Sequence, residues 1–248
     1  MKIAVINFSG NVGKTTVAKH LLLPRMAGAE YIAVESVNAG ADDAPSVRGS
    51  QFAKLMEYLH TVEHAVVDIG ASSAEELMGL MRDYEGSIHD FDCFIVPTVP
   101  PLKQQQDTIA TLIELARQGA SPSGLKVLFN LVDNSVALED AFYLLLDFLA
   151  EEPIATADTA CQLRSNEIYA RIRGKKGRQA DIAALAHDET DYKQLIVRAA
   201  DPAAKIGLAK QLATTQLARS VVRQHDACFA ALALDQLVQG AAANGASP

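Results

Sequence analysis

The sequence predicts an α/β fold, a three-layer sandwich with a mostly parallel central sheet, helices on both faces and further helices at the C-terminal end. Two observations predict it. Short apolar segments alternate with longer segments of helical period, as in parallel sheets whose strands are linked by helices. The 248 residues, 49% of them hydrophobic, also suffice to bury one sizeable core.

The predicted strands are the five apolar segments at residues 2–6, 31–34, 65–67, 93–96 and 126–129. The first passes through a glycine-containing turn into a helix predicted at residues 15–23, which Pro24 ends. An amphipathic helix follows Pro101 and another is predicted at residues 137–149. Both are expected to cover the sheet.

The pattern changes beyond residue 155, where a basic stretch and a polar section precede a long Ala/Leu-rich helix predicted at residues 203–238. We therefore predict a core at residues 1–170 and a flexible tail at residues 240–248. Between them, residues 171–239 are predicted to form a basic segment and a helical appendage packed on the core.

Composition excludes several classes of protein. A net charge of -8 and a pI near 5.2 argue against a surface coated throughout with nucleic acid, although a local basic patch remains compatible with it. Three cysteines, far apart and odd in number, predict neither a disulfide framework nor a CxxC site. No secretory signal is recognisable at the N-terminus, and charges interrupt every apolar run well before the ~20 residues of a membrane span. We expect a cytoplasmic protein.

Residues 8–16 read Phe-Ser-Gly-Asn-Val-Gly-Lys-Thr-Thr and predict a phosphate-binding P-loop. Gly10 and Gly13 permit backbone conformations in which successive N–H groups point at phosphate oxygens. Lys14 supplies a positive charge for the β- and γ-phosphates of ATP, Thr15 supplies a hydroxyl for Mg²⁺, and the following helix directs its positive end at the anion. The predicted nucleotide-binding residues are Ser9, Gly10, Asn11, Val12, Gly13, Lys14, Thr15 and Thr16.

The usual motif begins with a glycine where this chain has Phe8, so the strict pattern is missed by one residue. The competing interpretation is an ordinary strand-to-helix turn followed by a chance Lys-Thr pair. The strand before the loop and the helix after it favour phosphate binding.

The loop resembles that of the deviant Walker A ATPases of the ParA/MinD group, which reads Lys-Gly-Gly-x-Gly-Lys-Thr-Thr. Two glycines, the second lysine and both threonines match, whereas the first lysine, which in the group reaches across a dimer to the partner's nucleotide, is Ser9 here. The opening Asn-Phe-Ser-Gly-Asn-Val-Gly-Lys-Thr-Thr and the later Val-Glu-Ser-Val-Asn are similar to StbB-type plasmid stability and conjugation proteins, a branch without that lysine. The motifs span residues 1–174.

An apolar run ends in Asp68, which places a carboxylate at the C-terminal end of a buried strand, where open α/β sheets form ligand sites. The resemblance implies that Asp68 is the Walker B aspartate, holding Mg²⁺ through water, and that residues 69–72 form the switch that senses the γ-phosphate. The alternative is that Asp68 caps a helix beginning near Ser73.

Two further positions follow from the resemblance. The group's Asp-x-Asp, whose second aspartate orients the attacking water, aligns with Glu35 and Val37, so that Asn38 or Asp42 remain candidates for the water. Residues 128–133 resemble a strand ending in Asn-x-x-Asp, in which the asparagine reads adenine. An amide donates and accepts at once, as the adenine edge requires, so Asn130 is the candidate for base recognition. A turn-forming asparagine is the alternative.

A basic stretch lies within an otherwise acidic chain. Its cations are candidates for direct contact with DNA phosphates or an acidic partner: Arg171, Arg173, Lys175, Lys176 and Arg178. A solvated loop is the alternative. The C-terminal helix is expected to dock through its leucine and valine residues on the helices of the sheet or on a second copy. Membrane binding is not expected, because Asp226 and Asp235 interrupt the basic face that it requires.

The resemblance implies a cytoplasmic ATP- and Mg²⁺-binding switch protein with weak hydrolysis of ATP to ADP and phosphate. It further implies a role in plasmid stability, DNA positioning or conjugative transfer, with a homodimer and a plasmid-encoded DNA-binding partner protein as partners. Two alternatives stay open. One is a nucleotide-binding adaptor without catalysis, favoured by Ser9 and Val37, and the other is a small-molecule kinase or ligase on the same scaffold.

Overall fold

A computed structural model describes residues 1–34, 45–172 and 180–237 of the chain. They fall into two compact units, each described by itself. The first comprises residues 1–164 and the residues from Cys228 onward, and the second comprises residues 165–227. The boundary predicted at residue 170 and the packing of residues 171–239 on the core stay predictions.

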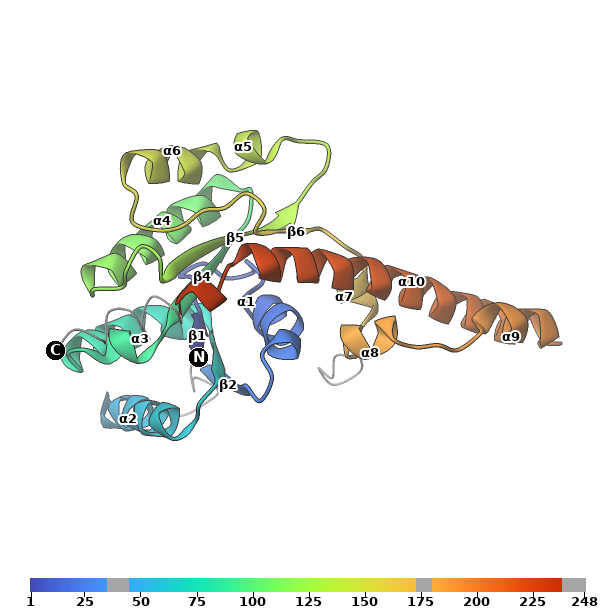
Figure 1. The fold of residues 1–248 in the computed structure, drawn as a ribbon, viewed down its shortest axis with the longest axis horizontal. Coiled ribbons are helices and arrows are strands. Elements are labelled where there is room, and N and C mark those ends of the chain that lie inside the picture. The colour runs from blue at the N-terminus through green and yellow to red at the C-terminus, as the bar shows by residue number, and fades with distance from the viewer. Residues whose placement is uncertain (35–44, 173–179, 238–248) are drawn as a thin grey trace. The chain divides into compact units, whose positions relative to one another are not determined.

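The first unit is built on a six-stranded sheet in which every pair of neighbouring strands is parallel, in the order β2-β3-β1-β4-β5-β6 (Figure 1). The predicted α/β fold with a parallel sheet is therefore confirmed. The strands are β1 (Lys2–Val5), β2 (Glu30–Val34), β3 (Ala65–Ile69), β4 (Cys93–Thr98), β5 (Leu125–Val132) and β6 (Gln162–Arg164). Because all six run the same way, their carboxyl ends share one edge, from which the loops of the candidate site emerge.

Helices of the first unit follow the strands in the alternation that the sequence predicts. They are α1 (Lys14–Thr16), η1 (Val17–Leu22), η2 (Leu23–Arg25), α2 (Pro45–Thr61), α3 (Ala71–Asp83), η3 (Ser87–Asp90), α4 (Leu102–Arg117), α5 (Leu138–Ala141) and α6 (Tyr143–Glu151).

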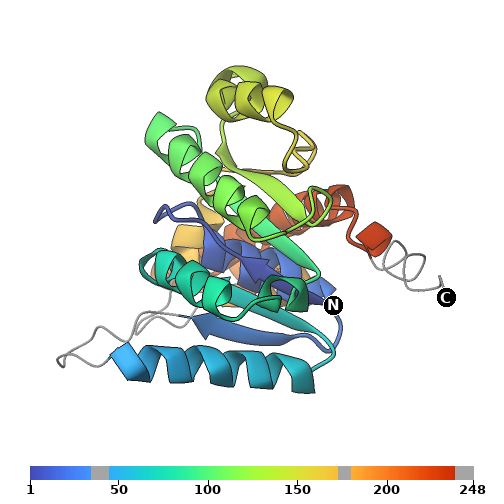
Figure 2. The ribbon, with the colours of Figure 1, turned by 90° about the vertical axis from the view of Figure 1, so that its left-hand side faces the viewer.

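One face of the sheet packs against α2 to α6, whose buried apolar side chains form the larger core with residues such as Val67, Val96 and Phe129. Helices α3 (teal) and α4 (green) lie in front of the strands in Figure 2. The opposite face is covered by the buried stripe of η1 and by Leu232 and Leu234 from the end of the chain. Helices on both faces were predicted from the sequence.

The helix predicted at residues 137–149 is in fact two helices. The break falls at Phe142, whose backbone leaves the helical region at φ -119° and ψ 24°. Its side chain is fully buried and meets the ring of Phe129 edge-on, with ring centroids 4.9 Å apart. Burial of this aromatic ring accompanies the interruption of the helix.

The second unit consists of α7 (Ile168–Arg171), α8 (Ile182–Ala186), α9 (Tyr192–Arg198) and the greater part of α10 (Pro202–Ala231). Its core contains Ile168, Ile182 and Val221. The helix predicted at residues 203–238 ends earlier, at Ala231, because Ala233 adopts a left-handed conformation with φ 48° that a helix cannot continue through.

Candidate functional site

The predicted phosphate loop connects β1 to α1 at the carboxyl edge of the sheet. Two of its residues, Asn11 and Gly13, have positive φ angles of 58° and 91°. Such angles turn successive N–H groups toward one side of a loop, which suits an anion. A side chain at Gly13 would place its Cβ 2.1 Å from Nδ2 of Asn130, so this position also requires glycine for space.

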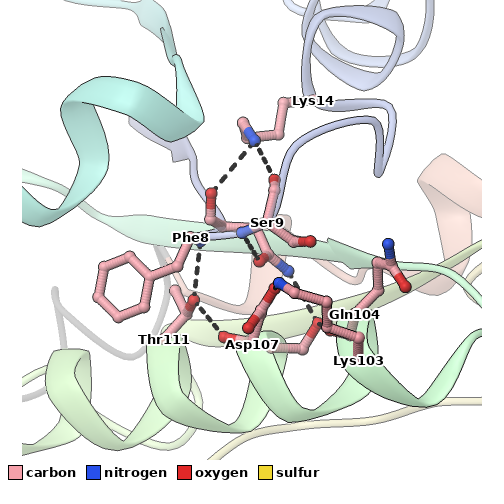
Figure 3. Close-up of polar contacts among 9 residues, drawn as sticks. Phe8, Ser9, Lys14, Lys103, Gln104, Asp107 and Thr111 are labelled. Atoms are coloured by element: carbon pink, nitrogen blue, oxygen red, sulfur yellow. Dashed lines mark hydrogen bonds and ion pairs between the residues drawn. The ribbon is translucent and has the colours of Figure 1, made fainter.

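Lys14 is folded over the loop to which it belongs (Figure 3). Its Nζ donates to the backbone oxygens of Asn7, at 3.1 Å, and Ser9, at 2.6 Å, and the residue is only 8% exposed. Burial lowers the pKa of Lys14 from 10.5 to about 8, against the attraction of the Asp68 carboxylate, which raises it. The loop thus holds a partly desolvated amine where the motif predicts phosphate contact.

Asn7 anchors the beginning of the loop, and the sequence pattern gave no reason to single it out. This fully buried amide donates from Nδ2 to the oxygen of Pro97, at 2.9 Å, and to Oγ1 of Thr108, at 2.8 Å. Its Oδ1 accepts from the N–H of Ser9, at 2.7 Å. One side chain therefore joins the loop, the end of β4 and helix α4.

A second hydrogen bond joins the loop to α4 at the next residue, Phe8, and Figure 3 shows it together with Asp107 of the same helix. The N–H of Phe8 donates to Oγ1 of Thr111, at 3.0 Å. Asp107, on the same helix, accepts from Nζ of Lys103 at 2.8 Å. The hydrogen bonds of Lys103 and of the Ser9 hydroxyl lower the pKa of Asp107. Ser9, which stands where the ParA/MinD-type loop has its first lysine, is therefore buried among groups of its own chain.

Asp68 lies on β3, one residue before the strand ends, and is 6% exposed. The hydroxyl of Tyr31, on the neighbouring strand β2, donates to its Oδ2 at 2.8 Å. Helix α3 begins at Ala71, with Gly70 as its N-cap and without a side-chain cap, so Asp68 does not cap it. The N–H of Gly70 donates instead to the oxygen of Val34, at 2.8 Å. The segment predicted as a switch thus contains the end of β3 and the beginning of α3.

Asn130 is buried within β5, next to the loop. Its Nδ2 donates to the oxygen of Val12, at 2.9 Å, and its Oδ1 accepts from the N–H of Leu131, at 2.8 Å. Leu131 has a positive φ of 55°, an uncommon conformation for a branched residue. In this structure, the amide proposed for base recognition supports the phosphate loop.

A magnesium ion is implied by the motif, and the available groups fit one. Among the residues that the structure describes, no group of three or more His, Cys, Asp or Glu side chains is arranged to hold a metal. Mg²⁺ does not need such a group, because it keeps several waters and is held by one or two protein oxygens together with substrate phosphates. The exposed Thr15 hydroxyl and the Asp68 carboxylate are oxygen donors of this kind.

Some predicted residues lie outside the described ranges. These are Glu35, Val37, Asn38 and Asp42 of the second acidic motif, and Arg173, Lys175, Lys176 and Arg178 of the basic stretch. Arg171 is described: on α7, its guanidinium forms an ion pair of 3.1 Å with Glu167. In the described parts of the chain, no helix combines the length and apolarity needed to cross a membrane.

Comparisons with known proteins give matches only at the level of structure, since no protein-family model and no curated protein sequence matches the chain. An ATP complex of a McdA variant from Cyanothece is 15% identical, with a TM-score of 0.45, and the match covers 86% of this chain and 96% of McdA. The septum site-determining protein MinD with Mg-ADP from Pyrococcus horikoshii is 16% identical, with a TM-score of 0.42 and coverage of 68% and 83%.

A ParA structure, that of pnob8, is 14% identical, with a TM-score of 0.40 and coverage of 91% of this chain and 98% of ParA. This chain is thus similar in structure to McdA, MinD and ParA proteins, at low sequence identity.

Proposed function

We propose that this chain is a nucleotide-dependent switch protein that binds ATP with Mg²⁺ and hydrolyses it slowly to ADP and phosphate. The observation that carries the proposal is the loop itself. Asn11 and Gly13, with positive φ angles, lie directly before helix α1, and Lys14, the first residue of that helix, folds its amine back over the loop. Together these are the backbone, charge and dipole that a triphosphate requires.

The roles within the site follow from chemistry. Lys14 exchanges its two carbonyl partners for the β- and γ-phosphates, and Thr15 and Asp68 supply oxygens toward Mg²⁺. When bound, the metal would neutralise charge on the phosphates. Asn130 holds the loop through its hydrogen bond to Val12. The family resemblance also makes it the candidate for recognising the base.

The finer proposal rests on the motifs shared with StbB-type proteins. It assigns the switch to plasmid stability, DNA positioning or conjugative transfer, with a plasmid-encoded DNA-binding partner and direct DNA contact through the basic stretch at residues 171–178. A homodimer is proposed as well. Because Ser9 replaces the lysine that crosses the dimer in the ParA/MinD group, contacts other than that lysine must hold it together.

Nucleotide binding is tested first, by titrating the purified chain with a fluorescent ATP analogue with and without Mg²⁺. Lys14→Met should weaken binding about 10- to 100-fold, the worth of hydrogen bonds to a charged group. Lys205→Met, at an exposed position on α10, is the matched control and should leave affinity unchanged. Equal affinities in the two variants would refute the proposed role of the loop.

Turnover is tested separately, by measuring phosphate release with and without DNA. Release by the wild-type chain above the Lys14→Met background supports the ATPase. Binding without release in either condition would favour a nucleotide-binding adaptor. Loss of a plasmid that carries the gene, compared between wild type and Lys14→Met over unselected generations, tests the plasmid role.

A further inference from the structure

The hydroxyl of Tyr31 meets the carboxylate of Asp68, and neither the motif nor the family resemblance assigns Tyr31 any role. The Tyr31 hydroxyl donates to Oδ2 of Asp68 over 2.8 Å. Tyr31 is half-buried and Asp68 almost fully buried, so this hydrogen bond is partly shielded from water.

The strand register explains how the two side chains meet. Tyr31 pairs with Val66, and Asp68 lies two residues further along β3, so Tyr31 and Asp68 are diagonal neighbours on one face of the sheet. That face also carries η1, the helix that continues from the phosphate loop. From η1, Nζ of Lys19 lies 4.8 Å from the centroid of the Tyr31 ring, within cation–π range. The ring is thus held on one side while its hydroxyl reaches the carboxylate.

The orientation of the Asp68 carboxylate matters because the amine of Lys14 belongs to the same site. Burial lowers the pKa of Lys14, and the negative charge of the Asp68 carboxylate acts in the opposite direction. A carboxylate free to rotate could approach the amine and hold it away from a phosphate. A carboxylate with one oxygen bound to Tyr31 is restrained, and its Oδ1 remains to accept from water around a cation.

We propose that Tyr31 is a positioning residue that orients the Asp68 carboxylate toward the Mg²⁺ accompanying a bound nucleotide. The inference rests on the proposed ATP–Mg²⁺ function and deepens it. Tyr31 acts through Asp68 and touches no nucleotide group itself.

The test compares two variants that each delete one tyrosine hydroxyl bonded to a carboxylate. Tyr31→Phe keeps the ring beneath Lys19 and removes the bond to Asp68. Tyr58→Phe is the matched control, because the Tyr58 hydroxyl donates to the carboxylate of Glu30 away from the loop. Affinity for the ATP analogue is measured across a Mg²⁺ titration, and thermal unfolding is recorded without ligand.

We expect Tyr31→Phe to weaken the affinity for the analogue with Mg²⁺ about tenfold, equivalent to about 1.4 kcal/mol, while its affinity without Mg²⁺ stays within about twofold of wild type. Tyr58→Phe should change neither. In an Asp68→Asn background, adding Tyr31→Phe should have no further effect on Mg²⁺ dependence, since the residue through which it acts has been replaced.

The inference is overturned if Mg²⁺ raises the affinity of Tyr31→Phe for the analogue as much as it raises that of Tyr58→Phe. It is also overturned if Tyr31→Phe weakens binding equally with and without Mg²⁺, or if its effect is the same in the Asp68→Asn background as in the wild type. The wild-type titration separates this from failure of the proposed function. A wild-type chain that binds no analogue, or binds it without any Mg²⁺ effect, overturns the ATP–Mg²⁺ function and the inference with it.

Discussion

Replacing Gly13 by alanine tests the geometry of the phosphate loop more directly than replacing its lysine. The new Cβ would stand 2.1 Å from Nδ2 of Asn130, far inside any permitted contact, on a residue whose φ is 91°. Gly10 supplies a control within the same loop, because a Cβ there would meet no atom within 4 Å. The two substitutions add the same methyl group, but they differ in its surroundings and in the backbone conformation, since only Gly13 has a positive φ.

The expected cost of Gly13→Ala has two parts. Holding an alanine in the left-handed region costs about 1–2 kcal/mol. Relieving the clash requires Asn130 to withdraw, which breaks its 2.9 Å hydrogen bond to Val12 and leaves buried polar groups unpaired, at about 1–3 kcal/mol. Gly13→Ala should therefore lower the free energy of unfolding by about 2–5 kcal/mol, and Gly10→Ala by less than about 0.5 kcal/mol.

Chemical denaturation of both variants measures these costs, and a double variant isolates the second part. Because the hydrogen bond can be lost only once, Gly13→Ala combined with Asn130→Ala should cost about 1–3 kcal/mol less than the sum of the two single changes. The reasoning fails if Gly13→Ala is no more destabilising than Gly10→Ala, or if the double variant is strictly additive.

Four further predictions concern Lys14, Asn7 and Asn130. Because the folded chain releases the Lys14 proton near pH 8, affinity for ATP measured by titration should fall about tenfold between pH 7 and pH 9, and Lys14→Arg should abolish that fall. The same lowered pKa should make the wild-type free energy of unfolding rise, relative to Lys14→Met, from pH 8 toward pH 10.5, since only the unfolded chain then holds the proton. Asn7→Ala should cost about 3 kcal/mol in chemical denaturation, through lost bonds to Pro97, Thr108 and Ser9, and a cost below about 1 kcal/mol would contradict its anchoring role. Asn130→Ala should weaken ATP and GTP binding equally if the amide only supports the loop, whereas a changed ATP-to-GTP ratio would show that it reads the base.

The sequence predicts the fold well where its pattern is long enough to read. All five predicted strands lie within one residue of an observed strand start, because buried parallel strands are continuous apolar runs. Strand β6 has three residues, too few for a period, and α7 to α9 are short helices in a polar stretch. Their positions depend on tertiary contacts that no local pattern encodes.

The candidate site divides in the same way. The loop could be predicted because glycine, lysine and threonine stand close together in sequence and each has a chemical reason to be there. Asn7, which anchors the loop, lies 101 positions from its partner Thr108, and Tyr31 lies 37 positions from Asp68, to which it donates. Nothing in the spacing of such distant residues marks them as partners, so these supports emerge only from the folded chain.

The ties between the loop and α4 have a mechanical consequence. Two threonines one turn apart on the helix grip consecutive residues at the entrance of the loop, Asn7 by its side chain and Phe8 by its backbone. Displacing this entrance would stretch both hydrogen bonds together, so the loop and the middle of α4 are expected to move as one unit. A displacement of the loop caused by phosphate binding would then be transmitted along α4, which is 16 residues long, to positions well away from the nucleotide.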